Sequence, residues 1–259
     1  MRKNKFFLNL LFLANISFCF PEEYLKLISF NIHGFNQKKI LNKVNEIIDN
    51  IDDLDIILIQ ENWSYKTLFL EKLKNFTIFF GNRKKATFLD TGLTNSFSSK
   101  IDVIEYEDGL FSDCSGYIFR GSDCLSSKGF IYAKINYNGK ILDVYNTHLD
   151  SGDSRKDKCA RKKQLEEFKN FIISKKSNIP YIICGDFNID YFSEEKAVID
   201  KFILDLNLKI INSNSKYTSN KKIDYILFNG INDFMYLDLS DTLYHLSDHY
   251  PESIMLQVK

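Results

Sequence analysis

The stretch IICGDFNID, residues 182–190, follows an apolar run with an acidic and an amide side chain two positions apart. The run of Ile182, Ile183 and Cys184 predicts a buried strand. Asp186 and Asn188 at its end suit a turn, because both side chains bond readily to nearby backbone groups. Whether they also carry chemistry depends on what the other strand ends hold.

The rest of the chain mixes strand and helix patterns. Apolar periodicity predicts helices at 38–51, at about 156–175 and near 193–205. An Asn-Gly pair at 138–139 predicts a hairpin turn. Strands are expected at 24–34, 54–62, 101–106, 129–137, 140–147, 180–184, 223–228 and 250–257. Hairpins combined with βαβ-like units indicate two packed sheets with helices outside them.

The length of 259 residues and the hydrophobic content of 44% suit one large globular domain. We see no internal repeat and no Gly/Ser-rich linker, so residues 21–259 are expected to form a single domain. Residues 1–20 differ, because a basic start, a short apolar run and the following Pro21 have the layout of a secretory signal peptide. The sequence therefore predicts a secreted protein, cleaved after Cys19 or, alternatively, lipid-anchored at Cys19.

The charge balance argues against tight, sequence-independent binding of nucleic acid. Lysine and arginine number 34 and aspartate and glutamate number 34. Loss of residues 1–20 removes Arg2, Lys3 and Lys5 and no acid, so the formal charge moves from +0 to about −3. A slightly acidic product lacks the positive footprint that such binding needs.

Four cysteines follow the predicted signal peptide, and none forms a CxxC pair, so a zinc knuckle is not expected. Cys184 lies within an apolar strand and is interpreted as a small buried hydrophobe. Export favours at least one disulfide. The sequence leaves two pairings open, Cys124 with Cys114 or Cys124 with Cys159.

Polar side chains recur at the predicted strand ends. One histidine at a strand end is more often structural than catalytic, but so many acids, amides and histidines at strand exits indicate a shared site. They are Asn31, Glu61, His148, Asp186, Asn188, Asp224, Asp248 and His249.

These residue types suit attack of water on a phosphodiester. Oxygen ligands such as Glu61 and Asn31 suit Mg²⁺, which would neutralise charge on the phosphoryl oxygens. A histidine backed by a carboxylate can accept a proton from water near neutral pH, and His249 is the candidate. Donors such as Asn188 and His148 can hold the non-bridging oxygens.

The segments, in this order, resemble the endonuclease/exonuclease/phosphatase superfamily from about residue 25 to residue 257. The motifs GDFN at 185–188 and SDHYP at 247–251 carry most of the resemblance. It implies an α/β fold, a four-layer α/β/β/α sandwich of two packed mixed β-sheets flanked by helices. It also implies hydrolysis of phosphate esters with a divalent metal.

The resemblance assigns the metal ligands residue by residue. Glu61 would be the principal ligand, with Asn31 beside it, and Asp248 would complete or support the site. Mg²⁺ is the expected cofactor, with Mn²⁺ or Co²⁺ as substitutes.

The same resemblance assigns the catalytic roles. His249 paired with Asp224 would be the general base, and Asp186 is the competing candidate. Asp186 and Asn188 would orient the nucleophile and bind phosphate. His148 would bind phosphate or protonate the leaving group.

Within the superfamily, the middle of the chain resembles the secreted neutral sphingomyelinases, especially where Lys128-Gly129-Phe130 precedes a hairpin and the His148 strand. This implies hydrolysis of sphingomyelin to ceramide and phosphocholine at a membrane surface. The protein would be a monomer without an obligate protein partner. Lys128 would lie near the substrate phosphate, unless it is a solvated turn lysine. The resemblance also favours a Cys124–Cys159 disulfide.

One departure concerns the interval 227–246, which is too short for the long aromatic hairpin of membrane-lysing relatives. It retains apolar residues that suit either a small lipid-contacting tip or ordinary core, namely Phe234, Met235, Tyr236 and Tyr244. The alternative function is a secreted DNase-I-like endonuclease, which should show Arg, Lys and aromatic residues on loops beside the cleft. An inositol-phosphate phosphatase is a further alternative.

Overall fold

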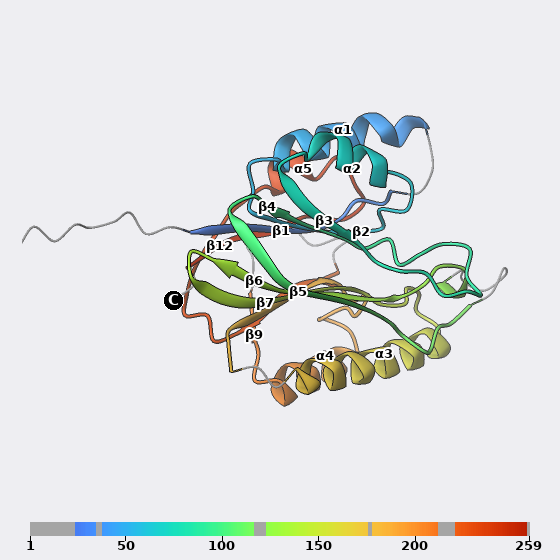
Figure 1. Ribbon diagram of the computed structural model, residues 1–259. Helices are drawn as coiled ribbons and strands as arrows, with labels where there is room; N and C mark the ends of the chain where they lie inside the picture. The colour runs from blue at the N-terminus through green and yellow to red at the C-terminus, as the bar shows by residue number, and fades with distance from the viewer. Residues whose placement is uncertain (1–23, 35–37, 117–122, 176–177, 212–220, 258–259) are drawn as a thin grey trace, which may run out of the picture.

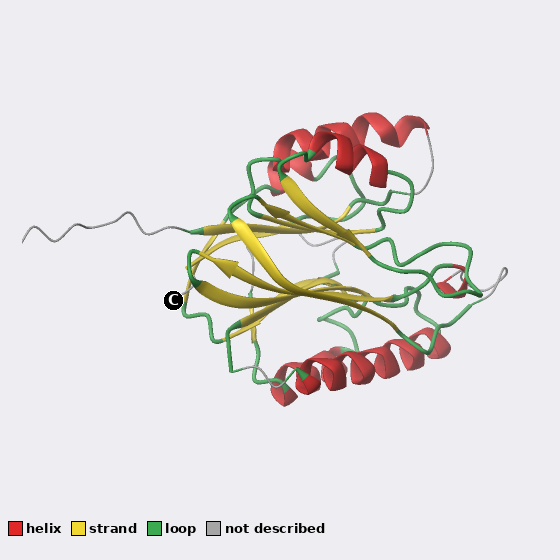
Figure 2. Cartoon of the chain, in the orientation of Figure 1, coloured by secondary structure: helices red, strands yellow, loops and turns green. Residues whose placement is uncertain are grey.

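Two six-stranded sheets form the centre of the computed structural model, which describes residues 24–34, 38–116, 123–175, 178–211 and 221–257. The sheets face each other and helices cover the outer face of each, so the layers run helix, sheet, sheet, helix (Figures 1 and 2). The predicted four-layer sandwich is confirmed. The predicted signal peptide, residues 1–20, and Cys19 lie outside the described residues. Among the described helices, none is long and apolar enough to cross a membrane.

The first sheet lies under three helices (Figure 1). Its strands follow the order β11 (Asp233–Tyr236), β12 (Glu252–Gln257), β1 (Leu25–Asn31), β2 (Ile56–Gln60), β4 (Thr94–Ser98) and β3 (Phe76–Phe80). At its centre β1 pairs in parallel with β2 and antiparallel with β12. The covering helices are α1 (Lys38–Ile51), α2 (Lys66–Lys72) and α5 (Ser240–Leu243).

The second sheet has a hairpin formed by its second and third strands and ends with a short edge strand. Its order is β5 (Ile101–Leu110), β6 (Gly129–Tyr137), β7 (Lys140–His148), β8 (Tyr181–Asp186), β10 (Asp224–Asn229) and β9 (Lys209–Ile210). α3 (Arg155–Ser174) and α4 (Lys196–Asp205) cover its outer face, and a short 3₁₀ helix, η1 (Asp123–Leu125), precedes β6. α3 begins at a capping box in which Ser154 and Asp157 bond each other's backbone N–H groups.

Each sheet is apolar on both faces, which is why the central strands are nearly continuous apolar runs. Leu27 and Leu58 point into the core between the sheets, whereas Ile28 and Ile57 point toward the helices above the first sheet. Tyr145 of the second sheet likewise faces the helices on its own outer side.

A polar network joins the two sheets beside this core. The Gln60 amide donates to Asn146 Oδ1 at 2.8 Å, and the Asn146 amide donates to Asn95 Oδ1 at 2.8 Å. All three residues are fully buried. Because Gln60 comes directly before Glu61, this network fixes the spacing of the sheets next to the predicted site.

The longer predicted elements all occur, with ends shifted by a few residues. Periodicity does not reveal β3, β4, β9, β11, α2 or α5, which have two to seven residues each. Such short elements contain too few turns or alternations for a pattern to be recognised.

The interval 227–246 contains the end of β10, the edge strand β11 and α5. Phe234 packs against the core between the sheets. Met235, Tyr236 and Tyr244 are instead exposed on the surface. The interval thus divides its apolar residues between core and surface, and its described elements are an edge strand and a short helix.

Candidate active site

In the second sheet, three neighbouring strands bring predicted site residues together. β7 and β8 are parallel, and their register places His148 opposite Asp186. β10 runs antiparallel to β8 and begins with Asp224, which also lies opposite Asp186. The register of the sheet therefore places these three side chains at one edge.

Strand ends of the first sheet lie next to this edge of the second sheet. Asn31 ends β1, and Glu61 follows the parallel strand β2. His249 precedes β12, which pairs antiparallel with β1. The two sheets meet at Asp186, whose Oδ2 accepts a hydrogen bond from the Asn31 amide at 3.0 Å and lies 3.8 Å from His249 Nε2.

Asp224 holds the imidazole of His249. Nδ1 of His249 lies 2.9 Å and 3.2 Å from the two carboxylate oxygens of Asp224. Burial disfavours the imidazolium, but the charges of Asp224 and Asp186 outweigh burial and raise the pKa of His249 to about 10. The pair has the geometry of a general base and its orienting carboxylate, and Nε2 is the nitrogen left to meet a substrate or water.

Asp186 is both a turn residue and a member of the site. Its Oδ1 accepts the backbone N–H of Asn188 at 2.8 Å, which is the turn contact expected from GDFN. Burial and the nearby charge of Asp224 raise the pKa of Asp186 to about 7. Asn188 adopts a left-handed backbone conformation with φ 52°, and its amide donates to the carbonyl of Leu149 at 3.1 Å.

His148 and Lys128 form a buried pair. The ammonium of Lys128, only 3% exposed, lies 2.9 Å from His148 Nε2 and 3.4 Å from an oxygen of Asp123. Burial and the charge of Lys128 lower the pKa of His148 to about 3, so the imidazole is neutral at physiological pH. Lys128 is therefore a buried member of the site, and the reading as a solvated turn lysine is wrong.

Glu61 lies between two histidines. Its oxygens are 3.5 Å from His33 Nδ1 and 3.8 Å from His148 Nε2. Burial opposes the charged form, but His33, His148 and Lys128 more than offset it and lower the pKa of Glu61 to about 2. The left-handed backbone of Glu61, with φ 60°, costs about 1–3 kcal/mol, and such strain is found most often at functional sites.

Asp248 lies at the outer edge of the site. Its side chain is 59% exposed, and Oδ2 is 3.6 Å from Nδ1 of His33. His33 thus separates Asp248 from Glu61, the predicted principal ligand, and the hydrogen bond with Glu61 raises the pKa of His33.

Three residues near the site were not predicted from the sequence. They are His33, Asp123 and Trp63, whose ring centroid lies 6.4 Å from that of His148. His33 could have been predicted as a site residue, because the chain has only four histidines and this one follows Asn31 by two positions. Nothing comparable marks the other two.

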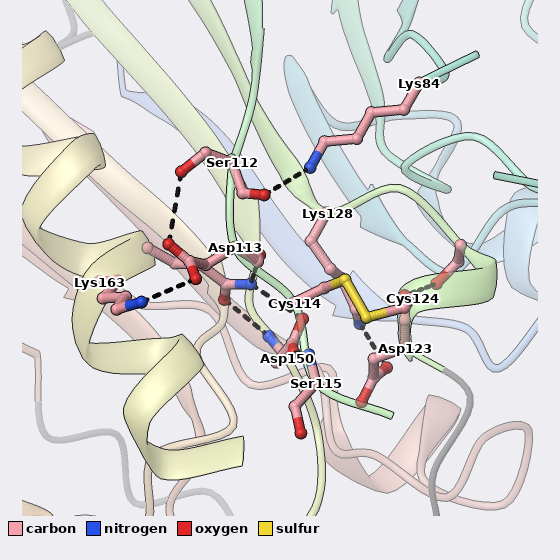
Figure 3. Close-up of a disulfide and its surroundings, with 12 residues drawn as sticks. Lys84, Ser112, Asp113, Cys114, Ser115, Asp123, Cys124, Lys128, Asp150 and Lys163 are labelled. Carbon is pink, nitrogen blue, oxygen red and sulfur yellow. Dashed lines mark hydrogen bonds and ion pairs between the residues drawn. A yellow bond between two sulfur atoms is a disulfide. The ribbon is translucent and has the colours of Figure 1, made fainter. Parts of the chain in front are cut away.

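The disulfide joins Cys114 to Cys124, so the favoured Cys124–Cys159 pairing is wrong (Figure 3). A backbone hydrogen bond of 3.1 Å from Cys124 to Gly116 brings the segment after β5 against η1, and the two Cα atoms are 5.3 Å apart. Cys159 is exposed on α3 as a free thiol, whereas Cys184 is free and buried, as predicted.

A model of the Endonuclease/Exonuclease/phosphatase family matches residues 28–249. The chain belongs to this family. One stretch is 32% identical over 145 residues to Sphingomyelinase C 2 of Leptospira interrogans, covering 53% of this chain and 22% of that protein. Another is 40% identical over 92 residues to Sphingomyelinase C of Listeria ivanovii, covering 31% and 27%. The matches thus span about a quarter of each curated relative.

A solved structure shares this fold. It is a beta toxin variant from Staphylococcus aureus with bound magnesium ions, which superposes with a TM-score of 0.71 at 20% identity. The superposition covers 91% of this chain and 100% of that chain.

In the protein described here, the side chains of Glu61 and Asn31 fit a divalent cation. Glu61 is an ionised, largely buried carboxylate. Asn31 Oδ1 accepts one hydrogen bond, from the backbone of His33 at 3.0 Å, and keeps a second lone pair. Carboxylate and amide oxygens are the ligands that Mg²⁺ prefers.

A second group of potential ligands consists of Asp186, Asp224 and His249, whose donor atoms lie within 4.8 Å of one another. In this group, Nδ1 of His249 is already bonded to Asp224. We therefore interpret these three residues as the acid–base part of the site.

Proposed function

We propose that this protein is a secreted, divalent-metal-dependent phosphodiesterase that hydrolyses sphingomyelin to ceramide and phosphocholine. The convergence of Glu61, His148, Asp186 and His249 from both sheets around one polar site supports the reaction most strongly. The likeness to two sphingomyelinases C supports the lipid substrate. The signal-peptide layout of residues 1–20 supports secretion.

His249 accepts the proton of the attacking water through Nε2. Asp224 keeps Nδ1 protonated and stabilises the imidazolium that forms, as in other histidine–carboxylate pairs. Asp186 is the competing base, since its pKa of about 7 also suits proton transfer near neutral pH.

The substrate phosphate is held by Lys128, Asn188 and His148. Lys128 supplies a positive charge, and the Asn188 amide lies at the same edge of the sheet. The pKa of about 3 favours phosphate binding by neutral His148 over protonation of the leaving group.

Glu61 and Asn31 hold the cation, for which Mg²⁺ is the proposed identity, and Asp248 supports the site from its exposed edge. When bound, the cation neutralises charge on the phosphoryl and leaving oxygens and, by offsetting nearby carboxylates, lowers the pKa of His249.

One set of incubations tests the proposal and its alternatives. Purified protein is mixed with sphingomyelin liposomes, plasmid DNA or an inositol phosphate, with Mg²⁺ or with EDTA. We expect release of phosphocholine with Mg²⁺ and none with EDTA. Nicked plasmid or free phosphate without phosphocholine would replace the proposed substrate by an alternative one, and full activity in EDTA would refute the metal dependence.

A further inference from the structure

The loop between β3 and β4, residues 81–93, lies at the rim of the candidate active site. β4 lies between β2 and β3, and its first residue, Thr94, pairs with Ile59 of β2 and with Phe80 of β3, so the loop leaves the first sheet at the end that carries Glu61. The backbone N–H of Asn62 donates to Gly92 at 2.8 Å, and Nε1 of Trp63 donates to the carbonyl of Asp90 at 3.1 Å. A side chain at Gly92 would meet Trp63 Nε1 at 2.7 Å, so the loop packs directly on the segment after Glu61.

The middle of this loop contacts the other side of the site. The backbone N–H groups of Phe88 and Leu89 donate to the carbonyl of Leu125 at 2.8 Å and 3.1 Å. The backbone N–H of Lys84 donates to the Ser127 hydroxyl at 2.8 Å. Since Ser127 precedes Lys128, the loop bridges the Glu61 segment and the Lys128 segment, at the right-hand end of Figure 1.

The loop carries an exposed aromatic ring beside three cations. Phe88 is 76% exposed. Arg83 and Lys85 are exposed and Lys84 is half-buried. Arg83 and Lys84 donate to the carbonyls of Phe88 and Ser112, at 3.4 Å and 3.2 Å, which leaves their charges uncompensated (Figure 3 shows Lys84 and Ser112).

One carboxylate of the loop, and one on β5 that contacts the loop, are already engaged. Asp90 pairs with Lys66 at 2.6 Å, and Asp108 accepts hydrogen bonds from Asn82. Within the described part of the chain, no ion pair joins Arg83, Lys84 or Lys85 to a carboxylate. The loop is therefore a cationic patch with an apolar tip on a protein whose formal net charge is +0.

We infer that residues 83–88 dock on the surface of a bilayer that contains anionic phospholipid. Cationic side chains are attracted to anionic headgroups, and an exposed aromatic ring is stabilised at the boundary between headgroups and acyl chains. Docking here brings the Glu61 and Lys128 segments to the membrane. This inference rests on the proposed function and adds that anionic neighbours of the substrate recruit the enzyme.

A nucleic acid backbone is the other polyanion that such a loop suits. Proteins that track a strand use several aromatic rings along a positive groove. This patch has one ring at a tip, and apart from its three cations the chain has 31 lysines and arginines (34 less 3) against 34 aspartates and glutamates. The observations favour the bilayer, and nucleic acid becomes an outcome of the test.

The test measures binding to phosphatidylcholine vesicles with and without phosphatidylglycerol, in EDTA, by cosedimentation. Without sphingomyelin or metal there is no turnover, so binding is measured alone. We expect phosphatidylglycerol to strengthen binding. The combined change Arg83→Gln, Lys84→Gln and Lys85→Gln should weaken it by about a hundredfold, because each cation near an anionic surface contributes about fivefold. Phe88→Ser should weaken it by about tenfold.

Two matched controls separate the loop from general effects. The combined change Lys43→Gln, Lys74→Gln and Lys140→Gln removes the same charge from exposed positions outside the loop. Leu204→Ser removes a comparably exposed apolar side chain from α4. Both should bind vesicles as the unchanged protein does, and thermal unfolding should show that all variants are folded.

Each other outcome overturns the inference. The first is that the protein does not bind anionic vesicles. The second is that the loop variants and the control variants weaken vesicle binding equally. The third is that the loop variants lose binding to duplex DNA while their vesicle binding is unchanged. Hydrolysis of sphingomyelin in detergent micelles is measured separately. Hydrolysis without vesicle binding refutes the docking surface alone, and vesicle binding without hydrolysis refutes the proposed function alone.

Discussion

Replacing Asp224 by asparagine keeps the shape of the side chain and removes the charge beside His249. Nδ1 of His249 lies 2.9 Å from Asp224 Oδ2. Two unit charges at that separation interact by about 6 kcal/mol at an effective dielectric constant of about 20. That energy corresponds to about four pKa units, which is comparable to the net rise of the His249 pKa from 6.5 to about 10 that Asp224 and Asp186 produce against burial. In Asp224→Asn the pKa should therefore fall to about 6–7.

The direct assay is an NMR titration of the His249 ring in EDTA, compared with the exposed control Asp102→Asn. Turnover of Asp224→Asn should fall by about 10³–10⁴-fold, since the imidazole loses the carboxylate that fixes its tautomer. A shift in pKa of less than one unit, or turnover within about tenfold of the unchanged enzyme, would refute the base assignment.

The same pair predicts how stability depends on pH. Because the folded pKa of His249 is raised, its contribution is fully present below the unfolded value of 6.5 and is lost as the pH rises through about 10. Between pH 7 and pH 10 the free energy of unfolding in EDTA should fall by about 3 kcal/mol from this pair. Urea unfolding of Asp224→Asn should lack that part of the decrease.

Three further changes test other parts of the structure. Glu61→Gln should weaken Mg²⁺ binding, measured by calorimetry, on the order of a hundredfold or more, since it removes the charged ligand. Lys128→Met should raise the pKa of His148, measured by NMR, because the lysine charge holds it down. Replacing Cys114 and Cys124 by serine should lower the free energy of unfolding by about 3 kcal/mol, because the disulfide closes a short loop. Urea unfolding measures that loss.

Each of these changes has a matched control. Glu71→Gln removes an exposed carboxylate from α2 and should leave Mg²⁺ binding unchanged. Lys74→Met should not move the pKa of His148. Cys159→Ser should leave stability unchanged, since this thiol is free. Equal effects of a change and its control would contradict the structural assignment behind it.

Much of the candidate site could be predicted from sequence because two features of the sequence identify the end of a strand. The apolar run 182–184 identifies a buried strand, and the polar residues after it identify its exit. Parallel neighbours then place their exits at one edge, as β7 and β8 do for His148 and Asp186. The fold class follows from the same pattern, since runs buried on both faces require helices outside.

What could not be predicted depends on how particular segments pack against each other in the folded chain. The Cys114–Cys124 pairing is decided by the backbone bond from Cys124 to Gly116, which no spacing rule reveals. The position of His33 between Glu61 and Asp248 depends on how the two sheets dock. Sequence separation carries no information on either.

The order of the strands has a consequence for biosynthesis. β1 to β4 build most of the first sheet, β5 to β10 build the second, and only then do β11 and β12 return to complete the first. His249 is part of that returning segment, so a ribosome that has synthesised the chain only as far as Asn229 has made every strand of the second sheet but neither the complete first sheet nor His249. Asp186 and Asp224 of the second sheet can therefore meet His249 only after the segment that follows Asn229 has been synthesised, so the site assembles late in folding.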